Sequence, residues 1–138
     1  MVVQGVHPYS EQQHYVLPGD PLLCQRLEWF QDQKLALMIH WGLYCELGIV
    51  ASWALSDADA DWSRHQINWI KDAEEFKQQY FGLNRSFNPV RFQPDEWADM
   101  AAECGFRYLL FTTKHHDGFC LWDTRYTDYK VTSAECPF

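Results

Sequence analysis

Two short apolar segments of the sequence each lead to histidine. Leu35–Ile39 runs directly into His40, and the apolar run Leu109–Phe111 is followed, three residues later, by the adjacent pair His115 and His116. A neutral imidazole can both donate and accept a hydrogen bond, and it can carry charge near pH 7. Three imidazoles brought together would therefore suit recognition of a hydroxyl-rich ligand, acid–base chemistry or metal binding.

Metal binding is the weakest of these three interpretations. Consecutive residues of a strand point to opposite faces, so His115 and His116 could share one ion only if the strand has already ended. Hydrolytic metal sites normally add carboxylates at defined spacing, and only Asp117 is close. The five cysteines form no CxxC pair, which favours free thiols over a zinc site. We therefore expect neither a metal nor another cofactor.

The residues do not complete a catalytic set. The sequence has no GxSxG nucleophile motif and no glycine-rich phosphate loop. Hydrolysis of a glycoside needs two carboxyl groups flanking the bond, whereas Asp117 is the one acid in the cluster. It is as well suited to orienting a neighbouring loop or histidine as to acting on substrate, and Asp57, Asp59 and Asp61 are better explained as a solvated face. The residues alone thus predict a recognition site.

The composition excludes some functions. The 138 residues carry a formal net charge of -8, with 11 basic side chains scattered among 19 acids, so we expect no nucleic-acid partner. No apolar stretch approaches the ~20 residues that span a bilayer, and residues 1–7 do not resemble a secretory signal. These observations predict no membrane association and leave the localisation open.

The elements that must position the histidines belong to an α/β fold. Helix and strand alternate along the chain, which is typical of parallel sheets whose ligands bind at the carboxyl ends of the strands. The short apolar runs predict strands that are buried on both faces. The expected elements are an extended lead-in at 1–20, helices at 21–33, 72–80 and 94–104, strands at 35–39 and 106–113, and a long irregular segment at 42–68.

Residues 28–138 resemble the α-L-fucosidases of glycoside hydrolase family 29. The resemblance is carried by KLALMIHWG at 34–42, by FNP at 87–89, by Phe92 and Trp97, by TTKHHDGFCLW at 112–122 and by TDY at 127–129. The segment with two histidines, aspartate, glycine and phenylalanine is the most specific of these.

The resemblance implies a partial (β/α)8 TIM-like barrel, with residues 21–138 forming the first two or three β/α units of the catalytic domain. It implies retaining hydrolysis of terminal α-L-fucose from fucosylated oligosaccharides or glycoconjugates, without a metal. His40, His115 and His116 would hydrogen-bond the fucose hydroxyls, and Trp53 would pack near the sugar. The nucleophile and the acid/base would lie beyond residue 138, so we expect the isolated chain to be inactive.

One position departs from the family pattern. Many members have Glu-Trp where this chain has Ser52-Trp53, so linkage or substrate preference would differ. The alternative to an enzyme segment is a non-catalytic remnant that binds fucose or a partner protein. Further sequence with strand-end Asp and Glu would favour the enzyme, and a stop after Phe138 would favour the remnant. The sequence does not indicate the oligomeric state.

Overall fold

The computed structural model describes residues 18–56, 61–64 and 72–138. The chain divides into two compact units, with the boundary between Lys34 and Leu35. The described part of the first unit contains helix α1 (Pro21–Asp32), as predicted. Its start is explained by Asp20, whose carboxylate accepts a hydrogen bond of 2.8 Å from the backbone N–H of Leu22. The predicted lead-in lies mostly outside the described residues.

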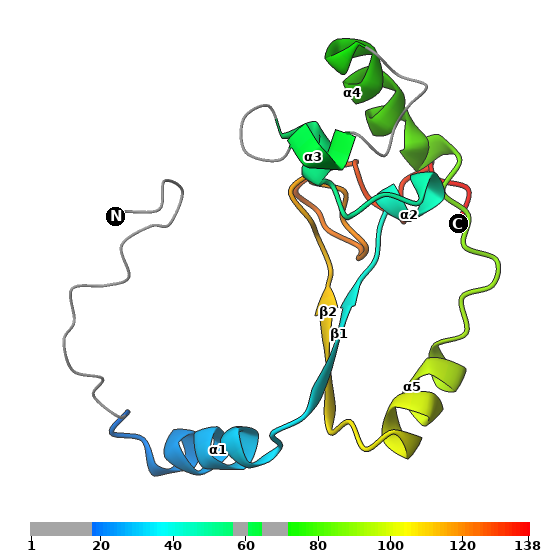
Figure 1. The fold of residues 1–138 in the computed structure, drawn as a ribbon. Coiled ribbons are helices and arrows are strands. Elements are labelled where there is room, and N and C mark those ends of the chain that lie inside the picture. Colours follow the sequence, from blue (N-terminus) through cyan, green and yellow to red (C-terminus); the bar gives the residue numbers. More distant parts are fainter. Residues whose placement is uncertain (1–17, 57–60, 65–71) are drawn as a thin grey trace. The chain divides into compact units, whose positions relative to one another are not determined.

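The second unit is organised around two parallel strands, β1 (Ala36–His40) and β2 (Tyr108–Thr112). Their register runs from Ala36 opposite Tyr108 to His40 opposite Thr112. Figure 1 shows the two strands side by side. Parallel strands need a crossover connection rather than a hairpin, and helices lie in the sequence between these two strands. The predicted α/β class is confirmed.

Helix α5 (Pro94–Glu103) leads into β2. Proline occupies its first position, acidic residues follow in the first turn, and Gly105 with φ of +82° ends it just beyond the cap. The predicted helix is confirmed. Met100, Ala101 and Cys104 have the spacing of one helical face, which is only partly buried: Ala101 is buried, whereas Met100 and Cys104 are exposed.

The strands are less buried than the sequence predicts. Met38 in β1 is 60% exposed and Leu110 in β2 is 45% exposed, so the expectation of burial on both faces is wrong for this chain. The physical reason is the size of the sheet. Within the described residues no third strand pairs with either one, and apolar side chains on a two-stranded ribbon find little to pack against.

The segment predicted to be irregular, 42–68, contains short helices. They are α2 (Tyr44–Leu47), the 3-10 helix η1 (Trp53–Leu55) and α3 (Asp61–Arg64). Gly48, with φ of +63°, terminates α2 in the left-handed conformation that favours glycine. Residues 57–60 and 65–71 are outside the described chain, and so are Asp57 and Asp59 of the predicted solvated acidic face.

Helix α4 (Ala73–Phe81) begins as predicted, with the Asp72 carboxylate accepting hydrogen bonds from the backbone N–H groups of Glu74 and Glu75. The 3-10 helix η2 (Gly82–Arg85) follows. No helix in the described parts of the chain is long and apolar enough to cross a bilayer.

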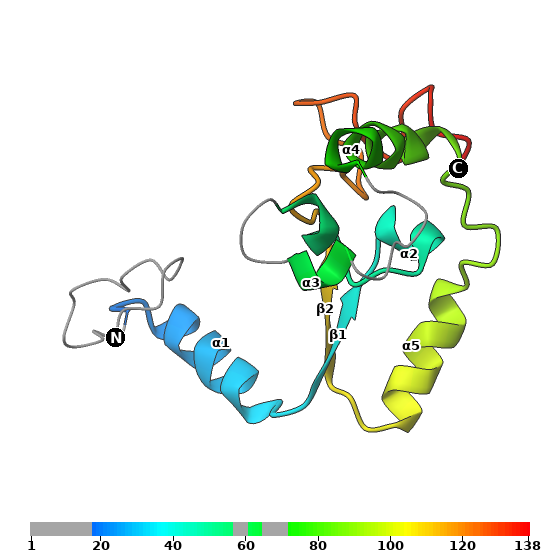
Figure 2. The ribbon, with the colours of Figure 1, turned by 45° about the horizontal axis from the view of Figure 1, so that its top comes forward.

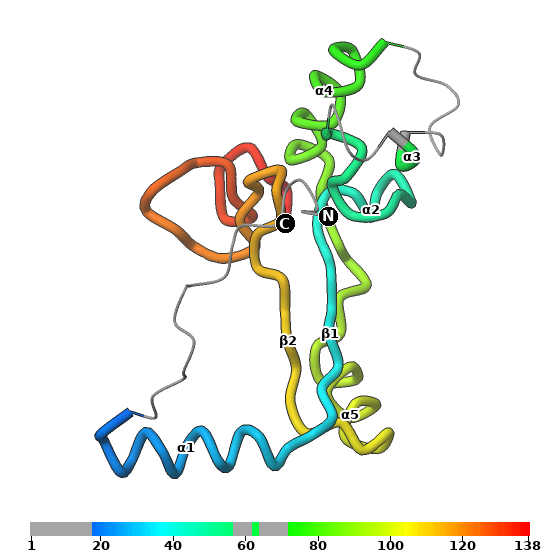
Figure 3. Tube along the Cα trace, turned by 60° about the vertical axis from the view of Figure 1, so that its left-hand side comes forward, coloured from blue at the N-terminus to red at the C-terminus, as the bar shows by residue number. Residues whose placement is uncertain are grey.

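The hydrophobic core lies at the carboxyl ends of the strands rather than on the faces of the sheet. Helices α2 and α4 and the segment after β2 gather there (Figures 1 and 3), and Figure 2 shows the same grouping from another side. The histidines lie against this core. Its members are Leu43, Tyr44, Ile49, Ala54, Phe76, Tyr80, Phe87, Phe119, Val131 and Cys136.

Candidate functional site

The three predicted histidines meet at one end of the two-stranded sheet. His40 is the last residue of β1, and β2 ends at Thr112, directly opposite it. The ring centroids of His40 and His115 are 5.7 Å apart, and those of His115 and His116 are 4.8 Å apart. Because β2 has already ended, the two adjacent histidines are free of the strand alternation that would have separated them.

Trp53 joins the same group from η1. Its ring centroid lies 5.4 Å from that of His116 and 6.1 Å from that of His115. The indole is 42% exposed, so part of its surface remains available for contact. All four side chains predicted to bind substrate are therefore neighbours, although they come from β1, from the loop that follows β2 and from a short helix between the strands.

A tight turn presents the histidine pair. The backbone N–H of Gly118 donates a 3.1 Å hydrogen bond to the carbonyl of His115, and Gly118 has φ of +81°. A non-glycine residue would be strained in this conformation. The turn is closed further by a 2.9 Å bond from the N–H of Leu121 to the carbonyl of Thr113. The backbone around both imidazoles is thus held by its own hydrogen bonds.

Asp117 stabilises this turn through its buried carboxylate. Its side chain is buried, and its Oδ1 accepts a 3.1 Å hydrogen bond from the N–H of Phe119. Its Oδ2 accepts a 2.6 Å hydrogen bond from the hydroxyl of Tyr80 on α4. The sequence allowed this carboxylate either to orient the loop or to act on substrate. Its contacts fit the first of these roles.

The electrostatics favour a neutral His115. Burial is the main influence lowering its pKa below the ordinary value, and the neighbouring His116 acts in the same direction. The Nδ1 atom of His115 shares a hydrogen bond with the hydroxyl of Ser52, which is almost fully buried. With Nδ1 engaged in this way, Nε2 is the nitrogen left to meet a ligand.

Among the described residues, two hollows adjoin the histidines. The larger, of about 480 Å³, is lined by His40, Thr112, Lys114, His115, His116 and Gly118. The smaller, of about 300 Å³, is lined by Ser52, Trp53, Leu55, Ser56 and His116. His116 lines both, so the two hollows flank a single imidazole. Together they offer hydroxyl, imidazole and indole groups, which are suitable partners for a ligand with many hydroxyls and an apolar face.

The metal interpretation finds no donor set in the part of the chain that the structure describes. Within those residues, no group of three or more His, Cys, Asp or Glu side chains is arranged to hold an ion. All five cysteines are free thiols, as predicted.

Trp41 has a packing role rather than a place beside the histidines. Its ring stacks on Phe92 at a centroid distance of 4.9 Å and meets Trp97 edge-on at 5.8 Å. Phe87 and Phe111 complete the group at 5.7 and 6.3 Å. Four of the aromatic residues in the sequence motifs thus form one structural cluster, which anchors the loop after β1 to α5 and β2.

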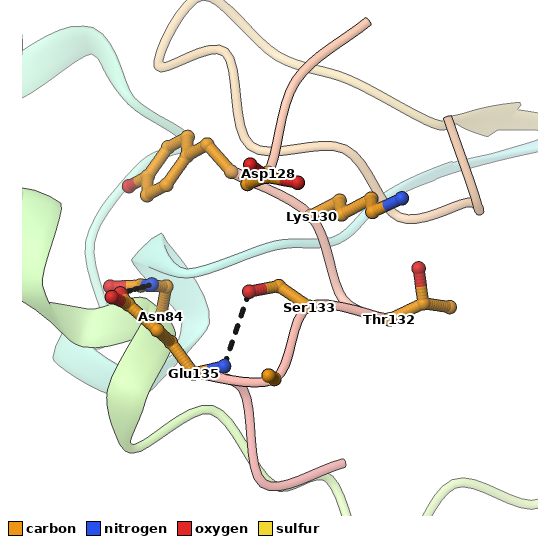
Figure 4. Close-up of a pocket in the computed structure, with 8 residues that line it drawn as sticks. Asn84, Asp128, Lys130, Thr132, Ser133 and Glu135 are labelled. Carbon is orange, nitrogen blue, oxygen red and sulfur yellow. Dashed lines mark hydrogen bonds between the residues drawn. The ribbon is translucent and has the colours of Figure 1, made fainter. Parts of the chain in front are cut away.

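A further hollow, of about 680 Å³, lies away from the histidines (Figure 4). It is lined by Asn84 and by residues 128–130 and 132–135. Several of its polar groups bond one another: the Asn84 amide donates to the Glu135 carboxylate at 3.4 Å, and the N–H of Glu135 donates to the Ser133 hydroxyl at 3.2 Å. None of the predicted substrate-binding residues lines it.

Sequence reasoning missed two residues that support the site. Tyr80 bonds Asp117, and the Tyr44 ring meets His115 edge-on at a centroid distance of 5.6 Å. Neither residue carries a local sequence signal beyond being an aromatic residue in or beside a helix. Ser52 was noticed only as a departure from a family pattern, and its contact with His115 could not be inferred from that.

The fold and the site together define an α/β protein whose histidine cluster lies at the carboxyl ends of two parallel strands, the edge at which ligands bind in folds of this class. Comparison with known proteins specifies the family. The family model "Alpha-L-fucosidase" matches residues 3–137. The chain therefore belongs to the α-L-fucosidase family.

Relatives and solved structures agree with this assignment. The chain is 30% identical over 111 residues to the tissue α-L-fucosidase of Rattus norvegicus, covering 79% of the chain and 24% of that protein. A family 29 α-L-fucosidase from Bacteroides thetaiotaomicron superposes with a TM-score of 0.59 at 32% identity, covering 86% of the chain and 25% of its own. The fucosidase AlfC from Lactobacillus casei, in complex with α-L-fucose product, superposes with a TM-score of 0.61 at 33% identity, covering 83% and 33%. The chain spans about a quarter of the length of the curated relatives it matches.

Proposed function

We propose that this chain supplies the fucose-binding part of a retaining α-L-fucosidase acting on fucosylated oligosaccharides or glycoconjugates. In this proposal His40, His115 and His116 hydrogen-bond the hydroxyls of the sugar, and Trp53 packs against it. The observation that carries the proposal is the meeting of these four side chains beside two adjoining hollows, in a chain of the fucosidase family.

The chemistry of the side chains suits a sugar of this kind. Each imidazole offers one donor and one acceptor when neutral, which matches a hydroxyl that can also do both. Each such hydrogen bond contributes a net stabilisation of about 0.5 to 1.5 kcal/mol. The exposed part of the Trp53 ring offers an apolar surface for the carbon-bound hydrogens of a deoxy sugar.

The residues described do not provide the two acids of the reaction. A retaining glycosidase uses a nucleophile and an acid/base whose carboxyl groups lie about 5 to 5.5 Å apart. Asp117 is buried and already accepts two hydrogen bonds, so it is poorly placed to attack a sugar. We therefore assign no catalytic residue to this chain and expect it to bind the sugar without cleaving it.

We further propose that residues 21–138 form the first β/α units of a (β/α)8 barrel. A barrel of this kind typically needs about 250 residues. The support is a parallel pair of strands whose apolar side chains are exposed, in a chain that covers 25% and 33% of two similar fucosidase structures. Further β/α units would pair with the free edges of β1 and β2, and the barrel interior and outer helices that they complete would cover Met38 and Leu110.

The experiment is a hydrolysis assay on the purified 138-residue chain with 4-nitrophenyl α-L-fucoside. We expect no release of nitrophenol above a matched preparation of the His116→Ala variant. Release by the monomeric wild-type chain that is lost in the variant would overturn the assignment of the catalytic acids to residues outside this chain.

A further inference from the structure

The buried contact between Tyr80 and Asp117 connects two distant parts of the chain. Tyr80 lies on α4, 37 residues before Asp117 in the turn that follows β2. The bond is short, at 2.6 Å, and both side chains are buried. A hydrogen bond to a carboxylate that is shielded from water is among the stronger ones in a protein.

Tyr80 is buried, and its ring packs against other residues of its own helix. Its side chain has no exposed surface, and its ring packs against Phe76 and Phe81 at centroid distances of 5.9 Å each. Helix α4 is fixed at its start by the Asp72 cap. The Tyr80 ring is thus buried against its own helix, and its hydroxyl donates to the Asp117 carboxylate.

Asp117 links the Tyr80 hydroxyl to the turn that carries the histidines. One carboxylate oxygen accepts from Tyr80, and the other accepts from the N–H of Phe119. The adjacent bond from Gly118 N–H to the His115 carbonyl closes the turn that contains both imidazoles. If the carboxylate moves, the backbone that carries His115 and His116 moves with it.

Two other phenols lie near this carboxylate without bonding it. The Tyr44 and Tyr129 hydroxyls are buried and have no hydrogen-bond partner among the described residues. Burial raises the pKa of both, and the Asp117 charge raises it further. Tyr80 is thus the one of these three neighbouring tyrosines whose hydroxyl holds the carboxylate.

We propose that Tyr80 is a positioning residue for the sugar-binding histidines, acting through Asp117 from α4. The proposal rests on the proposed function, since that function gives the histidines their ligand. Tyr80 itself touches no hollow that adjoins the histidines. Its role is to place the turn so that His115 keeps its contact with Ser52 and its Nε2 remains directed to the ligand.

The test compares Tyr80→Phe with wild type in the 138-residue chain carrying 15N-labelled histidine. NMR titration would give the pKa of His115, assigned with a His115→Gln variant, and amide exchange would be followed at Gly118 and Phe119. We expect the His115 pKa to rise, because loss of the phenol leaves the Asp117 charge less compensated and the imidazole more hydrated. We expect exchange at both amides to accelerate roughly tenfold or more.

Tyr126→Phe is the matched control, because Tyr126 lies in the same loop and is 84% exposed. It should leave both readouts unchanged. A merely structural role for Tyr80 would lower global stability while leaving the His115 pKa of the folded variant at the wild-type value, and that result would overturn the proposal.

Two further variants keep the test decisive. If Tyr80 acts through Asp117, adding Tyr80→Phe to Asp117→Asn should change the His115 pKa no further, and an additive change would contradict the proposal. If Tyr80→Phe does not fold, Asp117→Asn alone should accelerate exchange at Gly118 and Phe119, and unchanged exchange would overturn the proposal. These readouts need no sugar, so they can fail or succeed independently of fucosidase activity.

Discussion

Asp117 should be among the least replaceable side chains of the chain. It is 7% exposed and accepts hydrogen bonds from the Tyr80 hydroxyl at 2.6 Å and the Phe119 N–H at 3.1 Å. Asp117→Ala would strand both donors in a buried site. Each stranded donor costs about 1 to 3 kcal/mol, so the expected loss in the free energy of unfolding is about 2 to 6 kcal/mol.

Asp117→Asn is the gentler variant. The asparagine carbonyl can still accept one of the two hydrogen bonds, but its NH2 group faces the other donor. We expect a loss of about 1 to 3 kcal/mol, which a chain of ordinary stability would survive. Urea unfolding followed by tryptophan fluorescence would measure both losses.

Asp128→Ala provides the control, because Asp128 is exposed on the same loop. It should change the free energy of unfolding by no more than about 0.5 kcal/mol. If Asp117→Ala proved as harmless as Asp128→Ala, the buried network would not stabilise the turn, and the reasoning from its two hydrogen bonds would be refuted.

Other expectations concern protonation, the loop around Ser52 and the exposed sheet. Because the His115 pKa is lowered on folding, the unfolded chain binds more protons near its ordinary pKa of ~6.5, so stability should fall as the pH drops through that value. Urea titrations should show this dependence weaken in His115→Gln, and an identical pH dependence would contradict it. Ser52→Glu places a carboxylate beside His115 and should raise the imidazole pKa in an NMR titration, whereas no shift would refute the contact. The exposed apolar side chains of the two-stranded sheet should make the chain self-associate. Leu110→Lys in β2 should reduce this self-association in sedimentation experiments, and equal association of the variant and wild type would show that the sheet does not cause it.

The helices were predictable because their signals are local. Asp20 and Asp72 accept hydrogen bonds at helix starts, Pro94 occupies a first helical position, and Gly105 follows a helix end. Each signal acts within a few residues of its helix, so sequence reasoning could find it. The short helices within 42–56 were missed because they are single turns without apolar periodicity.

The burial of the strands could not be predicted in the same way. An apolar run such as Leu109–Phe111 predicts a strand, but how much of it is covered depends on which other elements pack on it. In this structure Leu109, Leu110 and Phe111 are all exposed. The sequence pattern describes a strand suited to a larger sheet than the two strands that the described residues form.

The candidate site also has one feature that the sequence predicts and one that depends on tertiary packing. The meeting of His40 with His115 and His116 followed from one general rule, that parallel strands share a carboxyl edge. The hydrogen bond between Tyr80 and Asp117 joins residues that are 37 positions apart in the sequence, and it depends on how α4 packs against the turn. No periodicity or motif encodes such a pairing, so only the three-dimensional structure could show it.

NMR titration of the folded chain with L-fucose would show whether the histidine cluster binds this sugar. We expect saturable shifts at the imidazoles of His40, His115 and His116 and at the Trp53 indole, with affinity in the range of ~1 mM or weaker for so few hydrogen bonds. D-fucose, the mirror image, should produce much smaller shifts at the same groups. L-fucose shifts that are absent from these four side chains, or equal for the two enantiomers, would contradict the proposed binding of fucose.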